Sequence, residues 1–263
     1  MHHFFVSPAN ISSEEIIIDG PDVNHIKNVL RKKIGDEIAV SNGEDGREYR
    51  CRIERMDDVI GCRLEFVKEA DTELPVKIYL FQGLAKGDKM ETVVQKAVEL
   101  GAFEIIPVAM KRSVVKYDEK KARSKTERLR LVSEAAAKQS RRCVIPDVHD
   151  VLNVHEAIEY ASRLDRLIVP YELEGVDINS DKGTDAGYAR AFGMTRDIME
   201  SLKGVSSVGI FIGPEGGFDE EEIAALKSAG ADIITLGKRI LRTETAGMAV
   251  ISWLIYITEI CGK

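Results

Sequence analysis

The sequence predicts an α/β protein in which a small β-rich domain precedes a larger domain built on a parallel sheet. The chain has 263 residues, which is enough for two hydrophobic cores. Residues 1–70 look β-rich, with strand-like alternation of apolar and polar side chains at 47–55, whereas the remainder alternates short apolar runs with helical segments. A polar, proline-containing stretch at 69–77 separates the two patterns. We therefore place the boundary near residue 73, with domains at 1–72 and 73–263.

The first domain is expected to be a small barrel with one helix. Residues 47–55 alternate apolar with charged side chains, and 59–67 repeat the pattern after a short acidic turn, so both segments predict half-buried strands. Residues 21–33 predict a helix, because Pro21 suits a first turn and basic residues stand at the end.

The second domain alternates predicted strands with predicted helices, an order typical of a parallel sheet covered on both faces. Asp88 and Gly101 are expected to begin and end its first helix, and Ser124 with Glu127 forms a capping-box pattern. The polar segment 173–189 is expected to be a surface loop. The expected strands are 76–84, 103–110, 165–172, 205–213 and 231–237, and the expected helices are 88–101, 124–142, 187–203, 219–229 and 246–260.

Cysteine spacing and the lack of long apolar runs argue against several protein classes. The four cysteines form no C-x-x-C pair, so neither a zinc site nor a disulfide framework is expected. The N-terminus lacks the pattern of a signal peptide. The most apolar segment, 246–257, is shorter than the about 20 residues that span a bilayer. We expect a cytoplasmic protein with free thiols, no metal and no membrane partner.

Charge is distributed unevenly along the chain. The net charge is −7, yet residues 111–142, which we call the basic block, carry twelve Lys and Arg against four acidic residues. Local positive charge is what neutralises a nucleic-acid backbone, so the basic block is a candidate phosphate-binding surface. A solvated helix face is the alternative interpretation.

The stretch FIGPEGGFDEEEI, residues 211–223, places a glycine-rich turn directly after a predicted strand. Open parallel sheets bind ligands at the carboxyl ends of their strands, so a ligand site is expected here. The chain contains no G-x-G-x-x-G and no G-K-[ST] motif, and the following helix opens with Asp219 and three glutamates. These acids disfavour a phosphate at the helix N-terminus, so a cationic or neutral ligand suits the turn better.

A second polar loop, LGKRILRTETAGMAV at 236–250, follows the next predicted strand. Taken alone, Thr243 and Thr245 would be helix N-caps, and Arg242 with Glu244 an exposed ion pair. We interpret both loops together as one ligand site, because both follow strands that we expect to be adjacent.

GPEGGFDEEEI followed by LGKRILRTETA resembles the signature of the RsmE family, SPOUT-superfamily methyltransferases that act on N3 of a uridine in bacterial 16S ribosomal RNA. The likeness covers the whole chain, because MHHFFV, HIKNVLRKKIGDEIAV, KGDKMETVVQKAVELGAFEIIPV, KRSVV and SEAAAKQSRR occur in the family's order. It implies a PUA-like RNA-binding barrel, a C-terminal trefoil knot, S-adenosylmethionine as donor, a homodimer and 16S rRNA within the 30S subunit as partner. Such a donor carries a sulfonium cation and no phosphate.

The resemblance also implies roles for particular residues. Arg242 and Glu244 would face the reacting uridine. Because N3 is largely protonated at neutral pH, our own hypothesis is that Arg242 stabilises negative charge on the base and Glu244 orients Arg242; a general-base role for Glu244 is the less favoured alternative. Residues that would hold the donor are Ile212, Gly213, Glu215, Gly217, Leu236, Gly237, Ile240, Leu241 and Ala246. Residues that would contact rRNA are Arg31, Lys111, Arg112, Arg141 and Arg142.

Two positions depart from the family pattern, and both lie in the predicted RNA-binding half. His3 stands where the family has Arg, and Asn24 with His25 stands where the family has two histidines. For His25 we expect a helix-face residue that packs on the barrel. Two other functions remain open: a ribosome-assembly factor without activity, and a small-molecule α/β enzyme, which would leave the basic block unexplained.

Overall fold

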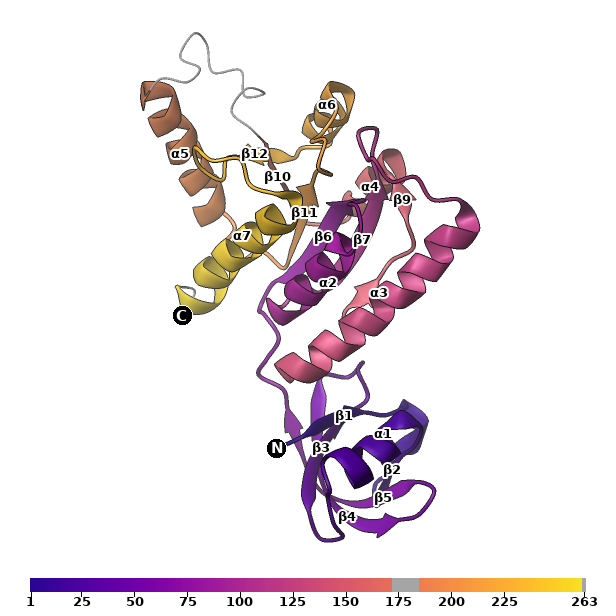
Figure 1. Ribbon diagram of the computed structural model, residues 1–263. Helices are drawn as coiled ribbons and strands as arrows, with labels where there is room; N and C mark the ends of the chain where they lie inside the picture. Colours follow the sequence, from indigo (N-terminus) through magenta and orange to yellow (C-terminus); the bar gives the residue numbers. More distant parts are fainter. Residues whose placement is uncertain (172–184, 262–263) are drawn as a thin grey trace. The chain divides into compact units, whose positions relative to one another are not determined.

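The computed structural model describes residues 1–171 and 185–261, and the chain divides into two compact units (Figure 1). The first unit contains Met1–Glu73 and Glu134–Ile145, and the second contains Leu74–Ser133 and Pro146–Lys263. Residues 134–145 therefore belong to the first unit, although the sequence pattern assigned them to the second domain.

In the described residues the first unit is built on a five-stranded sheet of order β1-β3-β4-β5-β2. β1 pairs with β3 in parallel and the other pairs are antiparallel. Its core contains Phe4, Ile16 and Ile38 from three strands, together with Ile26. The strands are β1 (His3–Phe5), β2 (Glu15–Ile18), β3 (Glu37–Ser41), β4 (Arg47–Met56) and β5 (Ile60–Glu69).

The helix expected at 21–33 is shorter than predicted. It consists of α1 (Pro21–Asn24) and a π-helical turn (His25–Val29), and a 3-10 turn (Pro8–Asn10) precedes it in the chain. Arg31 has a φ of 51°, a left-handed conformation that ends a helix.

The last turns of α3 (Glu119–Ser140) complete the first unit. The Lys138 ammonium donates to both carboxylate oxygens of Asp22, at 2.7 and 2.6 Å. Beyond the helix, Ile145 N–H donates to the Gly43 carbonyl at 2.9 Å. Because α3 begins at Glu119, Ser124 lies inside the helix and the predicted capping box is wrong.

In the second unit the described strands form a seven-stranded parallel sheet of order β12-β10-β11-β6-β7-β8, with β9 also paired to β7. β10 lies between β11 and β12. The strands that precede the two candidate loops are therefore not adjacent, and our expectation that they would be adjacent is wrong. The short strands β8 and β9 were not predicted. The bounds are β6 (Lys77–Gly83), β7 (Glu104–Ala109), β8 (Asp147–Val148), β9 (Leu152–Asn153), β10 (Arg166–Pro170), β11 (Ser207–Ile212) and β12 (Asp232–Ile234).

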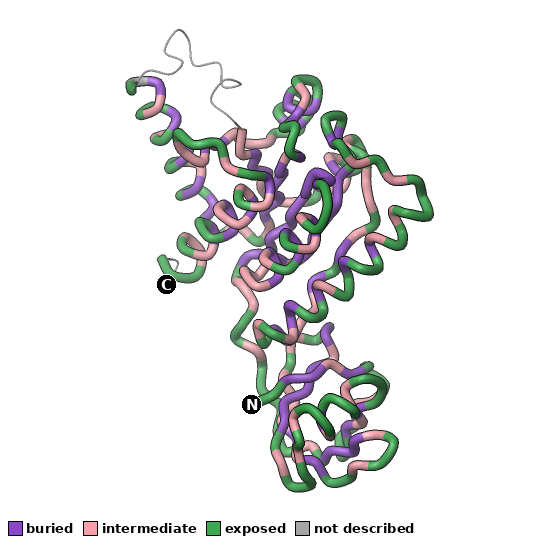
Figure 2. Tube along the Cα trace, viewed as in Figure 1, coloured by how far each residue is buried: buried purple, intermediate pink, exposed green. Residues whose placement is uncertain are grey.

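Helices cover both faces of this sheet, whose long strands are largely buried (Figure 2). Phe81 and Phe211 stack at 4.3 Å in a core shared with α4 and α6. α2 and α7 contact each other, and α7 also contacts β6 and β11 (Figure 1). The helices are α2 (Lys89–Glu99), α4 (Val154–Ala161), which was not predicted, α5 (Asp185–Glu200), α6 (Glu220–Ser228) and α7 (Thr243–Ile255), followed by a π-helical turn (Tyr256–Ile260).

Three predictions about composition can be compared with the structure. All four cysteines are free thiols. Within 1–171 and 185–261, no helix is long and apolar enough to cross a bilayer, and no cluster of three potential metal ligands occurs. Of the loop expected at 173–189, residues 173–184 lie outside the described residues, and the rest opens α5.

Candidate active site

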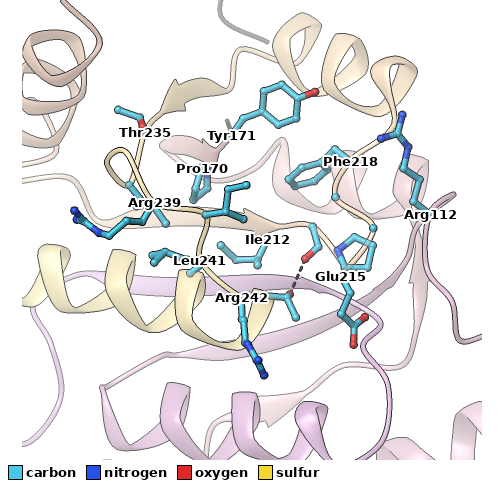
Figure 3. A pocket seen from close by; sticks show the side chains of 18 of the residues that line it. Arg112, Pro170, Tyr171, Ile212, Glu215, Phe218, Thr235, Arg239, Leu241 and Arg242 are labelled. Atoms are coloured by element: carbon cyan, nitrogen blue, oxygen red, sulfur yellow. Dashed lines mark hydrogen bonds between the residues drawn. The ribbon is translucent and has the colours of Figure 1, made fainter. Parts of the chain in front are cut away.

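A cavity of about 530 Å³ opens where strands β10, β11 and β12 end (Figure 3). Its walls come from Pro170 and Tyr171 at the end of β10, the turn 212–218 at the end of β11, and the loop 235–243 after β12. Lys89, Arg112 and Ala246 of α7 complete the lining. Parallel strands bring their carboxyl ends to one edge of the sheet, where open α/β sheets bind ligands. The two candidate loops thus form one site, although their strands are separated by β10.

The structure brings all nine predicted donor-binding residues into this cavity. They come from two loops about twenty residues apart in the sequence and from the first turns of α7, and Arg242 lines the same space. Their roles in binding stay predictions. The residues are Ile212, Gly213, Glu215, Gly217, Leu236, Gly237, Ile240, Leu241 and Ala246.

The cavity is lined by both apolar and charged side chains, and Arg112 lies near Phe218. Figure 3 shows Arg242 and Glu215 projecting together at one side, whereas Pro170, Tyr171 and Phe218 lie at the other. Such a cavity suits a ligand that carries both an aromatic or apolar part and charged groups.

The glycine-rich turn owes its shape to Gly217. This residue has a φ of 69°, which side chains other than glycine rarely adopt, and its N–H donates to the Pro214 carbonyl at 2.9 Å. The turn leads directly into the N-cap of α6, where the Asp219 and Glu222 side chains form a capping box. Lys111 Nζ lies 3.0 Å from the Asp219 carboxylate. The acids after the turn are therefore engaged by the helix end and by a cation.

Lys89 is a component of the site that the sequence did not indicate. Its ammonium lies 3.1 Å from Glu215 Oε1 and 3.6 Å from Glu244 Oε2. No ion pair among the described residues joins Arg242 to Glu244, so the expected orientation of Arg242 by Glu244 is not seen. Glu244 instead pairs with Lys89, which makes Lys89 the link between the glycine-rich turn and α7.

Glu215 is held in its ionised form. Burial acts to raise the pKa of its carboxyl, but the backbone N–H groups of Lys86 and of Glu215 itself, together with the Lys89 ammonium, outweigh burial and lower the pKa below its usual value. The Lys86 N–H donates to Glu215 Oε1 at 3.0 Å. The cavity wall therefore carries a fixed negative charge beside Lys89.

Family models match most of the chain. Residues 72–255 match an RNA methyltransferase domain, and residues 18–59 match an RNA methyltransferase PUA domain. The chain belongs to this RNA methyltransferase family.

Relatives and solved structures of methyltransferases align with almost the whole enzyme. Ribosomal RNA small subunit methyltransferase E of Bacillus subtilis is 37% identical over 99% of this chain and 98% of its own, and that of Aquifex aeolicus is 30% identical over 96% and 99%. The crystal structure of the Neisseria gonorrhoeae protein of that name, bound to S-adenosylmethionine, has a TM-score of 0.78 at 28% identity and covers 98% of each chain. A Legionella pneumophila protein in complex with the bound cofactor SAM has a TM-score of 0.77 at 28% identity, and the match covers 97% of each chain.

The five predicted RNA contacts of this RNA methyltransferase fall into different environments. Lys111 and Arg112 belong to the second unit, where Arg112 lines the cavity and lies 3.5 Å from Asp219. Arg31 and Arg141 belong to the first unit and are exposed. They are the described residues other than glycine with positive φ, at 51° and 61°.

Arg142 corrects one prediction. Its side chain is only 3% exposed, and its guanidinium donates to both carboxylate oxygens of Glu73, with Nε at 3.1 Å. A buried, paired guanidinium is not available to a phosphate, so the structure argues against Arg142 as an RNA contact. The neighbouring Arg141 is exposed to solvent.

The two family departures also have different environments. His3 is 8% exposed, and its Nε2 lies 2.9 Å from the Ser41 hydroxyl. Burial lowers the pKa of His3 to about 4, because the charged imidazolium is poorly solvated there. His25 is exposed, with its ring 6.4 Å from that of Phe4. His3 therefore belongs to the interior of the first unit, and the ring of His25 lies against that of Phe4 in the same unit.

One sequence signal could have identified Lys89. It is the first residue of α2, where the positive end of the helix dipole disfavours a cation. Nearby negative charge offsets this unfavourable effect, and Glu215 and Glu244 supply it. Pro170, Tyr171 and Phe218 carry no such signal, because apolar residues that line a ligand cavity do not differ in sequence from core residues.

Proposed function

We propose that this RNA methyltransferase transfers a methyl group from S-adenosylmethionine to N3 of a specific uridine in 16S rRNA of the small ribosomal subunit. The observation that carries the proposal is the convergence of nine family-matched donor residues with Arg242 in one cavity. The names of the relatives and the SAM in two related crystal structures support the same reaction.

The cavity suits this donor chemically. Its apolar lining residues, among them Ile212, Leu241 and Phe218, would hold the adenine, and backbone groups of the two loops would bind the ring edges and ribose. The donor supplies an electrophilic methyl group on a sulfonium. Glu215, ionised and beside Lys89, places a carboxylate on the cavity wall where a cation is favoured.

The acceptor must lose a proton before or during transfer. A bond forms between N3 and the methyl carbon, the carbon–sulfur bond breaks, and the N3 proton leaves to solvent or to a base. Arg242, the N-cap residue of α7, would stabilise the negative charge that develops on the uracil. Glu244 remains the candidate base, and its Oε2 is buried without a hydrogen-bond partner among the described residues.

The fold details that the resemblance implies belong to the same proposal. A trefoil knot is supported by the path of the chain, which reaches β12 at the sheet edge and returns to place α7 against β6 and β11. A homodimer through the last helix is supported by Trp253, Tyr256 and Ile260, large side chains exposed at the end of the chain. A cytoplasmic location follows from the substrate.

RNA recognition is assigned to both domains. We propose residues 1–72 as the PUA-like RNA-binding domain and 73–263 as the methyltransferase domain, with Arg31, Arg141, Lys111 and Arg112 as the phosphate contacts. The base must leave its stack to reach the cavity, which costs a few kcal/mol, so assembled 30S subunits are the expected substrate.

The test uses methyl-tritiated S-adenosylmethionine and 30S subunits from cells that lack the modification. We expect label in 3-methyluridine at one site, and in Arg242→Ala a loss of turnover with donor binding retained by calorimetry. Arg242→Lys keeps the charge but not the planar guanidinium, so its turnover should lie between those of the parent enzyme and Arg242→Ala. Donor binding without labelled RNA would favour an assembly factor, and methylation of free uridine would favour a small-molecule enzyme.

A further inference from the structure

Gln82 is a fully buried amide near the end of the interior strand β6. Its Nε2 donates to the Thr243 hydroxyl at 2.7 Å and to the Gly83 carbonyl at 3.0 Å. Its Oε1 is buried without a hydrogen-bond partner among the described residues. An unsatisfied buried acceptor costs about 1–3 kcal/mol, so an apolar side chain at this position would be the cheaper choice for stability alone.

The direction of the hydrogen bonds follows from the number of protons available. The Thr243 hydroxyl has a single proton, which it donates to the Gly213 carbonyl at 2.6 Å (dashed in Figure 3). Its oxygen must therefore accept from Gln82. The reversed amide would set Oε1 against the Gly83 carbonyl, two acceptors at 3.0 Å. The chain of bonds runs from Gln82 through Thr243 to Gly213, and we call it the Gln82 relay.

The Gln82 relay joins both walls of the cavity to the sheet. Gly213 opens the glycine-rich turn, and Thr243 is the first residue of α7, next to Arg242. The strand end also touches the turn directly, because a Cβ at Gly83 would lie 2.6 Å from the Pro214 nitrogen. The separation between the turn and the start of α7 is therefore set by contacts with the end of β6.

We propose that Gln82 is a positioning residue for methyl transfer, acting through Thr243 to fix the turn that holds the donor relative to Arg242, which faces the acceptor. The inference rests on the proposed function. Displacement at the methyl carbon needs an in-line arrangement, and an error of about 1 Å in such an arrangement can cost roughly 100-fold in rate. The relay is expected to act on turnover more than on donor affinity, because each wall can still contact the donor when the other has moved.

The experiment compares Gln82→Met, Thr243→Val and the double variant with the parent enzyme. We expect each single variant to lower kcat roughly 10- to 100-fold on 30S subunits at saturating donor, while the donor Kd from calorimetry changes less than about threefold. Because both substitutions break one chain of bonds, the double variant should be no slower than the slower single variant. Thr243→Ser, which keeps the hydroxyl, should recover most of the lost rate.

A matched control separates positioning from loss of stability. Ser133 Oγ donates to the Pro146 carbonyl at 2.6 Å, a buried hydrogen bond of the same unit outside the cavity. Ser133→Ala, which like Thr243→Val removes a hydroxyl that donates to a carbonyl, should lower Tm and leave kcat unchanged.

The following outcomes would overturn the inference. They are a kcat within twofold of the parent in Gln82→Met and Thr243→Val, rate losses that multiply in the double variant, or equal losses in Ser133→Ala. If the parent enzyme is active, any of these results refutes the positioning role of Gln82 and leaves the proposed function standing. A folded parent that yields no methylated RNA refutes the proposed function, and this role with it.

Discussion

Replacing Arg141 with glycine should make the protein more stable and its RNA binding weaker. Arg141 follows the last residue of α3 in a left-handed conformation, with φ of 61°. This is the helix-ending position where glycine is preferred. A side chain in this conformation costs roughly 1–2 kcal/mol of stability, which the substitution would recover. The greater conformational freedom of glycine in the unfolded chain lowers the stability again by about 0.5–1 kcal/mol. The expected net increase in the free energy of unfolding is therefore about 0.5–1 kcal/mol.

The same substitution removes a proposed phosphate contact. Loss of one charged hydrogen bond should weaken binding to 16S rRNA fragments roughly tenfold, and the slope of log K against log salt should fall by about 1. The assay is a salt titration of binding beside denaturant unfolding, with Arg141→Lys as the control that keeps both charge and strain. Arg141→Asn, which tolerates the left-handed region, should behave as glycine does.

Each half of this reasoning can fail separately. Unchanged affinity and salt slope in a stabilised Arg141→Gly would show that the exposed arginine does not contact RNA. A destabilised Arg141→Gly would show that contacts of the side chain outweigh the backbone strain.

Three further predictions concern buried or paired charges. Arg142→Ala should destabilise the first unit by about 2 kcal/mol in denaturant unfolding by leaving Glu73 unpaired, yet leave the RNA salt slope unchanged; a reduced slope would restore Arg142 as a contact. The pKa of His3 is about 4 when folded and 6.5 when unfolded, so its contribution is complete above pH 6.5 and is lost as pH falls toward 4, at about 1.4 kcal/mol per pH unit. His3→Gln, which can still donate to Ser41, should remove this dependence, and a variant with the same acid profile would contradict it. Lys89→Met should raise the donor Kd roughly two- to fivefold because the glycine-rich turn loses its link to α7, whereas Lys89→Arg should not; equal affinities would refute the link.

The sequence predicted the elements whose side-chain period is long and regular. The five main strands of the second unit and the helices α2, α5, α6 and α7 lie where the periodicity placed them. Strands β8 and β9 were not predicted, because each has two residues and so short an alternation cannot be distinguished from a loop. The order of strands was also beyond the sequence, since β12 reaches its place beside β10 through long-range pairing.

Some features of the candidate site could be predicted from the sequence and others could not. Glycines in an unusual turn and polar residues before an apolar helix stand out in a sequence, and all nine residues predicted to hold the donor line the cavity. Partners chosen in three dimensions do not stand out, and for this reason Glu244 was assigned to Arg242 rather than to Lys89. The burial of Arg142 was not predicted for the same reason, because nothing in the sequence distinguishes it from the exposed Arg141 beside it.

The segment 134–145 has a consequence for the order in which the protein can be made. On the ribosome, the first 73 residues emerge well before the end of α3 that completes their unit. Until that end is synthesised, Asp22, Gly43 and Glu73 lack the partners that Lys138, Ile145 and Arg142 provide. The first unit therefore cannot form all of its contacts before residues 134–145 are synthesised. A fragment cut at residue 73 should be soluble and stable only when 134–145 is supplied in trans or fused to it.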